Sequence, residues 1–244
     1  MYTREASALD LFTDSIRLMG DATLCGVLEF DRRLDPRALE EAAQACLLAH
    51  PILHSRLVRG SGPAFWEMIE NAHIPSLTVE ECDGDYHRQV IGPVDPYGPL
   101  QFRVRLLRRP PGDLIVINLA HAAADGFGLH TLMSQLLQEY LLPGSIPPAA
   151  GGIPERDTLW TRGLVRDEKP VSPEVRVINP LWPDPFGTSE EPIRFHRECI
   201  GPPVLAAIRA HARMLGGSIN DAVIAAYYLS LSDLTGYRGP IDLF

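Results

Sequence analysis

The sequence predicts a fold of the mixed α/β (α+β) class. Residues 114–120, LIVINLA, are apolar except for one asparagine and rich in β-branched residues, which is typical of a central strand buried on both faces. Residues 127–141 follow with apolar side chains at helical spacing, which predicts a helix that buries one stripe. The chain has 244 residues, 45% of them hydrophobic, so it can bury a substantial core.

Alternating side chains predict further strands. Residues 23–30, TLCGVLEF, place apolar side chains mainly on one side, as a half-buried strand does. Residues 99–107, PLQFRVRLL, alternate in the same way, and the RRPPGD loop at 108–113 separates them from the central strand. These two strands are therefore expected to form a hairpin. Residues 62–70, GPAFWEMIE, are another strand candidate.

Capping residues mark the boundaries of the helices. Asp35 and Pro36 suit the N-cap and the first position of a helix that stops before Pro51. The helix at 127–141 ends before Pro143. Its expected buried stripe comprises Leu129, Leu132, Met133, Leu136, Leu137 and Tyr140. His130 lies outside this stripe and is expected at the surface.

The composition of the sequence changes after this helix. Ten prolines fall from residue 143 to residue 192 without a sustained period, which is typical of a long crossover or linker. Beyond it we expect a strand at 193–200 and helices at 202–217 and 218–234. The expected divisions are a first unit over 1–142, a linker over 143–191 and a second unit over 192–244.

Composition excludes several classes of function. The formal net charge is -9, whereas proteins that bind nucleic acids carry a basic surface. No apolar run approaches the length that spans a bilayer, and the N-terminus lacks the features of a secretory signal. We therefore expect a cytoplasmic protein with no nucleic-acid partner and no membrane span.

The cysteines indicate no metal site. Their spacing contains no C-x2-4-C pair of the kind that zinc sites use. We expect all four to be reduced and packed. They are Cys25, Cys46, Cys82 and Cys199.

The join between the central strand and the next helix carries a pair of ionisable residues. His121, Asp125 and Gly126 form the pattern H-x-x-x-D-G. Imidazole exchanges protons near neutral pH, so a histidine on a rigid strand end suits a general base. Asp125 is either an acid/base partner or an anchor that accepts backbone N–H groups or pairs with an arginine. Gly126 allows a tight turn, and Ala124 with the two alanines before it leaves space beside the imidazole.

Two interpretations of this motif compete. A lone histidine beside an apolar strand is more often a satisfied core residue than a catalyst. The spacing of three fixed residues, set between a strand and a helix, favours the catalytic interpretation.

A basic cluster precedes the central strand. It can contact a phosphate group or an acidic protein, but we expect a solvated strand face and loop. Its members are Arg103, Arg105, Arg108 and Arg109.

The H-x-x-x-D-G motif resembles the active-site motif of the superfamily that contains chloramphenicol acetyltransferase, nonribosomal peptide synthetase condensation domains and polyketide-associated acyltransferases. Residues 34–58, with the His-Pro step at His50, resemble the early helix and strand of these enzymes. Residues 218–228, SINDAVIAAYY, resemble a helix of the wax ester synthase branch. Condensation domains usually carry two adjacent histidines, whereas Ala120 precedes His121 here. The resemblance is therefore nearest to the stand-alone polyketide-associated or wax ester synthase-like acyltransferases.

The resemblance implies a chloramphenicol acetyltransferase-like fold of two subdomains with a tunnel between them. It implies transfer of an acyl group from a coenzyme A or carrier-protein phosphopantetheine thioester to a hydroxyl or amine of a small-molecule acceptor, as in secondary metabolism. His121 is then the general base, and Asp125 orients its loop. The thioester is a co-substrate, and no bound cofactor or metal is implied.

The resemblance also assigns residues to the tunnel. These are Ala124, Asn220 and Asp221. Because Ser218, Asn220 and Asp221 also suit a helix N-terminus, we expect capping as their main role and an effect on the tunnel as a secondary one.

Two other functions stay open: a non-catalytic binding or scaffolding module, and a condensation-domain fragment of a peptide synthetase. In this superfamily the second subdomain is about as large as the first, yet one expected strand and two helices follow residue 192. The last helix is apolar on most sides and needs burial on most sides. We therefore expect a complete N-terminal subdomain and a partial C-terminal one. A second chain, or a C-terminal half beyond residue 244, is expected to complete the tunnel and to supply an arginine for Asp125.

Overall fold

The computed structural model describes residues 2–17, 21–70, 77–82, 86, 89–153 and 198–236. Its described residues fall into two compact units, the first up to residue 153 and the second from residue 198. The predicted linker lies mostly outside the described residues, and so does most of the strand expected at 193–200.

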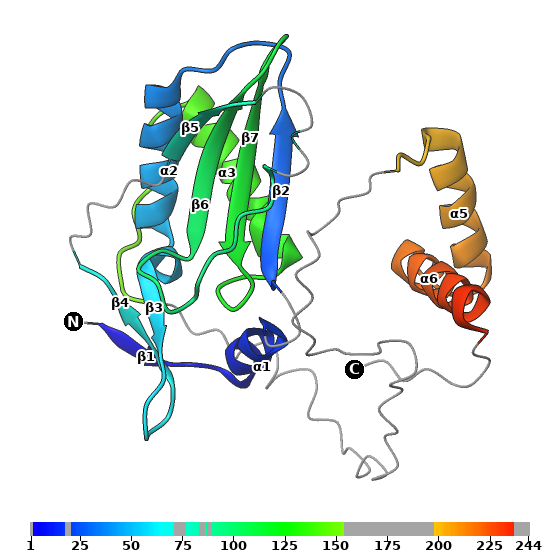
Figure 1. Ribbon diagram of the computed structural model, residues 1–244, viewed down its shortest axis with the longest axis horizontal. Helices are drawn as coiled ribbons and strands as arrows, with labels where there is room; N and C mark the ends of the chain where they lie inside the picture. Colours follow the sequence, from blue (N-terminus) through cyan, green and yellow to red (C-terminus); the bar gives the residue numbers. More distant parts are fainter. Residues whose placement is uncertain are drawn as a thin grey trace. The chain divides into compact units, whose positions relative to one another are not determined.

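The first unit combines two sheets with helices (Figure 1). In chain order its elements are β1 (Thr3–Glu5), α1 (Ala8–Ile16), β2 (Thr23–Glu29), α2 (Pro36–Ala49), the 3-10 helix η2 (Pro51–His54), β3 (Ser55–Val58), β4 (Phe65–Met68), β5 (Leu77–Glu81), β6 (Phe102–Arg108), β7 (Asp113–Ala120) and α3 (Gly126–Leu141).

The larger sheet has the strand order β2-β7-β6-β5. β7 pairs antiparallel with both β2 and β6, and β5 joins β6 in parallel. The predicted hairpin is confirmed, because Phe102 lies opposite Leu119 and Arg108 lies opposite Asp113. All eight residues of β7 are buried, which confirms the prediction of a central strand covered on both faces.

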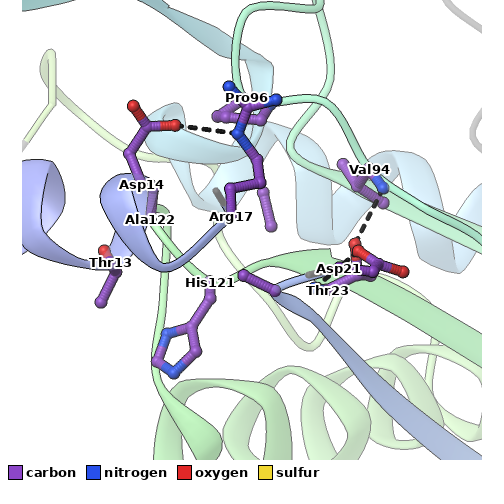
Figure 2. A pocket seen from close by; sticks show the side chains of 11 residues that line it. Thr13, Asp14, Arg17, Asp21, Thr23, Val94, Pro96, His121 and Ala122 are labelled. Carbon is purple, nitrogen blue, oxygen red and sulfur yellow. Dashed lines mark hydrogen bonds and ion pairs between the residues drawn. The ribbon is translucent and has the colours of Figure 1, made fainter. Parts of the chain in front are cut away.

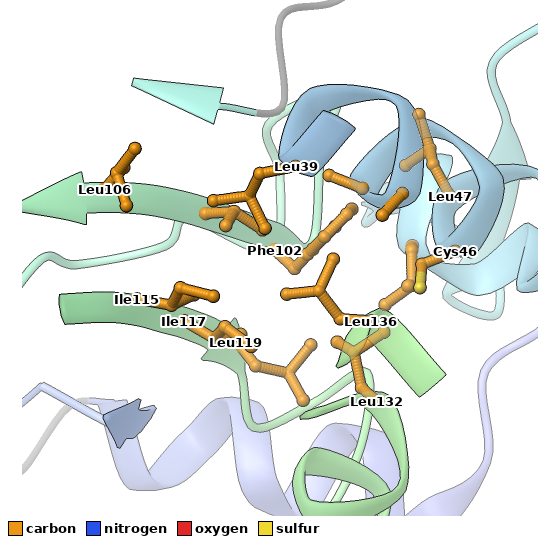
Figure 3. Packing of buried hydrophobic residues seen from close by; sticks show 14 of the residues in the cluster. Leu39, Cys46, Leu47, Phe102, Leu106, Ile115, Ile117, Leu119, Leu132 and Leu136 are labelled. Atoms are coloured by element: carbon orange, nitrogen blue, oxygen red, sulfur yellow. The ribbon is translucent and has the colours of Figure 1, made fainter. Parts of the chain in front are cut away.

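Helices α2 and α3 cover one face of this sheet (Figure 1). Figure 3 shows Leu39 and Cys46 of α2, Phe102 of β6 and Leu136 of α3 meeting in one apolar cluster. Gly26 lets α3 come close to β2, because a Cβ atom there would lie 2.6 Å from the Met133 sulfur. The predicted stripe of α3 is confirmed, with three of its leucines buried and the other members packed against the cluster.

The first turn of α2 follows the predicted capping pattern. The Asp35 side chain accepts a hydrogen bond from the backbone N–H of Arg37 at 2.9 Å, and Pro36 occupies the first helical position. The helix ends at His50, directly before Pro51.

The opposite face of the larger sheet is covered as well. Val90 and Ile91 pack against Leu107 and Val116 there. Under this cover Arg105 is buried, and it donates to the Asn118 side chain at 3.1 Å. Burial lowers the pKa of the Arg105 guanidinium, which the Glu80 carboxylate partly offsets.

The expectation that the four arginines form a solvated face is therefore wrong for Arg105. Arg103 is exposed, as expected. Arg108 donates to the buried Asp113 carboxylate at 2.6 Å, and Arg109 lies over the Tyr86 ring. Arg105 is covered by residues 90–92, which lie outside β6. The alternation of residues within one strand cannot predict such a cover.

A smaller antiparallel sheet, in the order β1-β4-β3, packs beside α1. Trp66 of β4 is fully buried, and its indole N–H donates to the Asp10 carboxylate at 2.9 Å. Asp10 also forms a capping box with Ser7 at the start of α1. The strand candidate at 62–70 is confirmed as β4, whereas α1 was not predicted.

The four cysteines are free thiols. Cys46 and Cys82 are buried, and burial raises the pKa of the Cys46 thiol to about 12. Cys25 and Cys199 are exposed, so the expectation that all four are packed is wrong for these two. Cys25 lies on the edge strand β2, and its thiol donates to the Val90 carbonyl oxygen at 3.1 Å.

The second unit contains α5 (Pro202–Met214) and α6 (Ile219–Thr235), as predicted. Ser218 caps α6, and Asp221 completes a capping box with it. Several large apolar side chains on this unit are more than half exposed: Val204, Met214, Leu215, Val223, Tyr227, Leu229 and Leu234. No described helix is both long and apolar enough to cross a membrane.

Candidate active site

His121 directly follows the buried strand β7, at the first position of a turn that leads into α3. The residue is partly buried. Its Nδ1 atom is buried and has no hydrogen-bond partner, which leaves Nε2 as the ring nitrogen open to a substrate. The strand fixes the backbone of His121, while no described side chain forms a hydrogen bond with either nitrogen of its ring.

Asp125 is the N-cap of α3. Its exposed carboxylate accepts a hydrogen bond from the backbone N–H of Gly128 at 2.8 Å. This contact is one of the two anchoring interactions expected for the residue. No ion pair between Asp125 and an arginine occurs within the described residues. The loop that carries His121 is thus held by the central strand on one side and by a capped helix on the other.

The two glycines of this region differ in what they permit. Gly126 does not have a positive φ angle, and a Cβ atom there would meet no other atom within 4 Å. Gly126 was expected to allow a tight turn, but neither its backbone conformation nor its surroundings require a glycine. Gly128 is the constrained position, because a Cβ atom there would lie 2.8 Å from the Cβ of Ala124. The sequence pattern did not single out Gly128.

The three alanines after His121 do not all leave space for a substrate. Ala122 and Ala123 are buried and pack in a cluster with Leu57 and Trp66. Ala124 is partly buried and lines an apolar cavity described below. The predicted passage is therefore supported at Ala124 and wrong at Ala123.

A small pocket beside His121 is lined by the end of α1, the start of β2 and the loop before β6. Figure 2 shows Asp14 and Arg17 on its wall, with the His121 ring pointing away from this pair. The pair therefore shapes the wall and does not contact the imidazole. Sequence analysis missed this wall because α1 was not predicted.

The wall is fixed by charge. The Asp14 carboxylate is buried and pairs with Arg59 at 2.6 Å and with Arg17 at 3.2 Å, and the Tyr97 hydroxyl donates to it at 2.8 Å. Burial acts to lower the pKa of the Arg17 guanidinium, but the neighbouring Asp14 and Tyr97 outweigh it and the pKa is raised. Burial and the Asp14 carboxylate also raise the pKa of the Tyr97 hydroxyl. Because both pKa values are raised, Arg17 and Tyr97 stay protonated and continue to donate to the Asp14 carboxylate.

The remaining predicted site residues lie on the second unit. The Asp221 carboxylate accepts hydrogen bonds from the backbone N–H and the hydroxyl of Ser218, which lowers the pKa of its carboxyl. Asn220 is the next residue of the same helix turn. The main role expected for this segment, capping, is confirmed at Asp221, and its effect on a tunnel stays a prediction. Within the described residues, no group of three or more His, Cys, Asp or Glu side chains is arranged to hold a metal ion.

Comparison with known proteins supports the resemblance seen in the sequence. The chain matches no model of a known protein family. It is 32% identical over 118 residues to the HC-toxin synthetase of Cochliobolus carbonum, which is 47% of this chain and 2% of that protein. It is 28% identical over 174 residues to an uncharacterized protein of Mycobacterium tuberculosis, which is 66% of this chain and 38% of that protein.

Solved structures decide the fold. The first condensation domain of the calcium-dependent antibiotic synthetase matches with a TM-score of 0.66 and 17% identity, over 98% of this chain and 62% of that domain. Polyketide synthase associated protein 5 from Mycobacterium tuberculosis matches with a TM-score of 0.62 and 18% identity, over 96% of this chain and 56% of that protein. The chain has the condensation-domain fold.

The predicted fold class is thereby confirmed. The match to the condensation domain extends over nearly the whole chain, so both described units belong to this fold. The chain spans less than two thirds of the length of these relatives. In this condensation-like fold, the second subdomain present is partial relative to the full domain.

Proposed function

We propose that this chain provides the catalytic base of an acyltransferase that moves an acyl group from a thioester to a hydroxyl or an amine. The observation that carries the proposal is the position of His121. It lies at the end of a fully buried strand, on a loop capped by Asp125, with one ring nitrogen left open, in a condensation-domain fold.

The proposed chemistry is a proton transfer coupled to acyl transfer. The open nitrogen of His121 takes the proton of the acceptor O–H or N–H as the acceptor's electron pair attacks the thioester carbonyl carbon. The carbon–sulfur bond then breaks, its electron pair leaves on sulfur, and the imidazolium returns the proton to the thiolate. The products are an ester or amide and a free thiol, and no oxidant or reductant is needed.

The anchoring of the loop supports this role. General acid–base catalysis requires the base within hydrogen-bond reach of the proton that it takes. β7 is paired on both sides, and Asp125 holds the first turn of α3, so the loop between them has two fixed ends. Asp125 is thus proposed to act through the position of His121 and to take no direct part in proton transfer.

Donor and acceptor are proposed by class. The donor is an acyl thioester of coenzyme A or of a carrier-protein phosphopantetheine, and the acceptor is a small molecule. Mass spectrometry of the protein with a panel of both kinds of donor would distinguish them. The similarity of part of the chain to a synthetase supports a condensation-domain fragment as a second candidate, whereas Ala120 in place of a second histidine favours a stand-alone acyltransferase.

The decisive experiment removes the base. His121→Ala should keep the fold and lower thiol release from the accepted donor by roughly 10²- to 10⁴-fold, the usual scale of general acid–base catalysis. His130→Ala is the matched control, because His130 is exposed on the adjacent helix. Circular dichroism would verify folding in both variants. Full activity of His121→Ala would overturn the proposal.

A further inference from the structure

An apolar cavity of about 170 Å³ is lined in part by the residues that flank the His121 loop. Its walls come from the end of α2, from η2 and from the first turns of α3, with Ile52, Leu53 and Leu132 among them. The volume is smaller than the roughly 300–1,000 Å³ typical of pockets that hold a whole small molecule, and it suits a short hydrocarbon chain. No carboxylate, ammonium or guanidinium group lines it, so its chemistry suits an uncharged, largely hydrocarbon ligand.

Two residues that line the cavity flank the proposed base in the sequence. Leu119 lies two residues before His121 and Ala124 three residues after it, and both line the cavity. Leu119 and Leu132 also lie together in the core cluster of Figure 3. Gly128 lines the cavity too, and a side chain there would collide with Ala124. The cavity is therefore lined by residues that precede and follow His121 in the chain, although His121 itself is not one of its lining residues.

One polar pair interrupts the apolar wall. The Nε2 atom of His50 lies 2.6 Å from the carboxamide oxygen of Gln135. Because a carboxamide oxygen only accepts, Nε2 is the donor. The pair leaves the NH₂ group of Gln135 as a free donor and Nδ1 of a neutral His50 as a free acceptor. Neither side chain makes another hydrogen bond within the described residues.

We propose that this cavity binds the carbon chain of the transferred acyl group, and that His50 and Gln135 select a chain that bears a hydroxyl or oxo group. The assignment rests on the proposed function. A hydroxyl uses both free positions of the pair, and an oxo group uses the donor. A plain alkyl chain leaves these part-buried groups without partners, which carries a free-energy penalty. The preference expected from one such hydrogen bond is about tenfold in affinity.

The first test measures binding without turnover. In the His121→Ala background, calorimetry would compare the acetyl and octanoyl thioesters of N-acetylcysteamine. Thr131→Phe fills the cavity and should weaken octanoyl binding at least tenfold while acetyl binding stays the same. Gln138→Phe places the same ring on the exposed side of α3 and should change neither. Equal effects of the two phenylalanine variants, or no octanoyl binding at all, would overturn the assignment.

The second test addresses the polar pair. A set of hydroxyoctanoyl thioesters that differ in the position of the hydroxyl group would be compared with octanoyl thioester. At least one should bind about tenfold more tightly, and Gln135→Leu should abolish that difference without lowering the melting temperature by more than a few degrees. A preference that survives Gln135→Leu, or the absence of any preference, would refute the role of the pair.

These binding results separate the two proposals. If His121→Ala retains full catalytic activity but Thr131→Phe blocks octanoyl binding, the cavity assignment holds and the proposed base is wrong. If His121→Ala is inactive but Thr131→Phe binds octanoyl thioester as well as the parent does, only the cavity assignment fails.

Discussion

Helices α3 and α6 are both rich in apolar residues, and they bury them to very different degrees. α3 covers the larger sheet with Leu132 and Leu136, which are 4% and 1% exposed. On α6, Leu229 and Leu234 are 68% and 83% exposed. Except for the exposed Phe127 and Leu141 in its first and last turns, the large apolar residues of α3 share one face, whereas those of α6 are distributed around the helix.

The comparison teaches that apolar content and stabilisation are separate properties. A leucine stabilises a fold in proportion to the apolar area that it removes from water. The N-termini of the two helices are alike, since each is capped by a side chain. Truncation of a leucine should therefore change the stability of the protein differently in the two helices, while removal of the N-cap should change it by a similar amount.

The largest expected effect is the difference between two leucine truncations. Leu136→Ala should lower the free energy of unfolding by about 2–5 kcal/mol, because it leaves a cavity in the core. Leu234→Ala should change it by less than about 0.5 kcal/mol, because that side chain is already solvated. Urea unfolding followed by circular dichroism measures both. Equal losses would show that α6 is covered in solution and would end the contrast between the helices.

An intermediate effect is expected at the N-caps. Asp125→Ala and Ser218→Ala should each lower stability by about 1 kcal/mol, because each leaves a backbone N–H of the first turn without its partner. Asp125→Asn is the matched control, since asparagine caps a helix as well as aspartate does. Thermal unfolding of the three variants tests the parity of the two helix starts. Unequal losses at Asp125 and Ser218 would break that parity.

The smallest expected effect is confined to acidic solution. Backbone N–H groups of Gly144 and Ile146 lower the pKa of the Glu139 carboxyl below its ordinary value of 4.5. Because the folded-state pKa is depressed, this stabilisation is present above the ordinary pKa and is lost as pH falls through the folded-state pKa. Asp221 of α6 should behave in the same way.

Urea midpoints measured between pH 7 and pH 3 would test this prediction. Glu139→Gln and Asp221→Asn should each flatten the fall in stability on the acidic side of about pH 4.5. Unchanged slopes in both variants would show that these hydrogen bonds do not persist in solution.

Local patterns in the sequence predicted the elements that are stabilised by their own neighbours. β7 could be predicted because a strand that is buried on both faces has a nearly continuous run of apolar residues. α2 could be predicted because Asp35 and Pro36 define its start. The stripe of α3 follows from helical spacing alone. The position of His121 between β7 and α3 could be predicted for the same reason.

The features that were missed depend on distant contacts. α1 is short, and its Asp10 is stabilised by Trp66, 56 residues away. β5 is an edge strand, and none of its residues is fully buried, so its apolar and polar residues do not alternate clearly. The burial of Arg105 depends on Val90 and its neighbours, and the wall beside His121 depends on Arg59 and Tyr97 meeting Asp14. Such contacts are set by topology, which no single segment of the sequence encodes.

The pairing of β7 on both edges has a consequence for amide hydrogen exchange. Amides in a strand that is buried on both faces and flanked by two partners exchange only when most of the domain unfolds. Edge strands such as β2 and β5 have one neighbour each and are free to open in smaller excursions. His121 is attached to one of the two interior strands, so local opening of the edge strands leaves the imidazole in place.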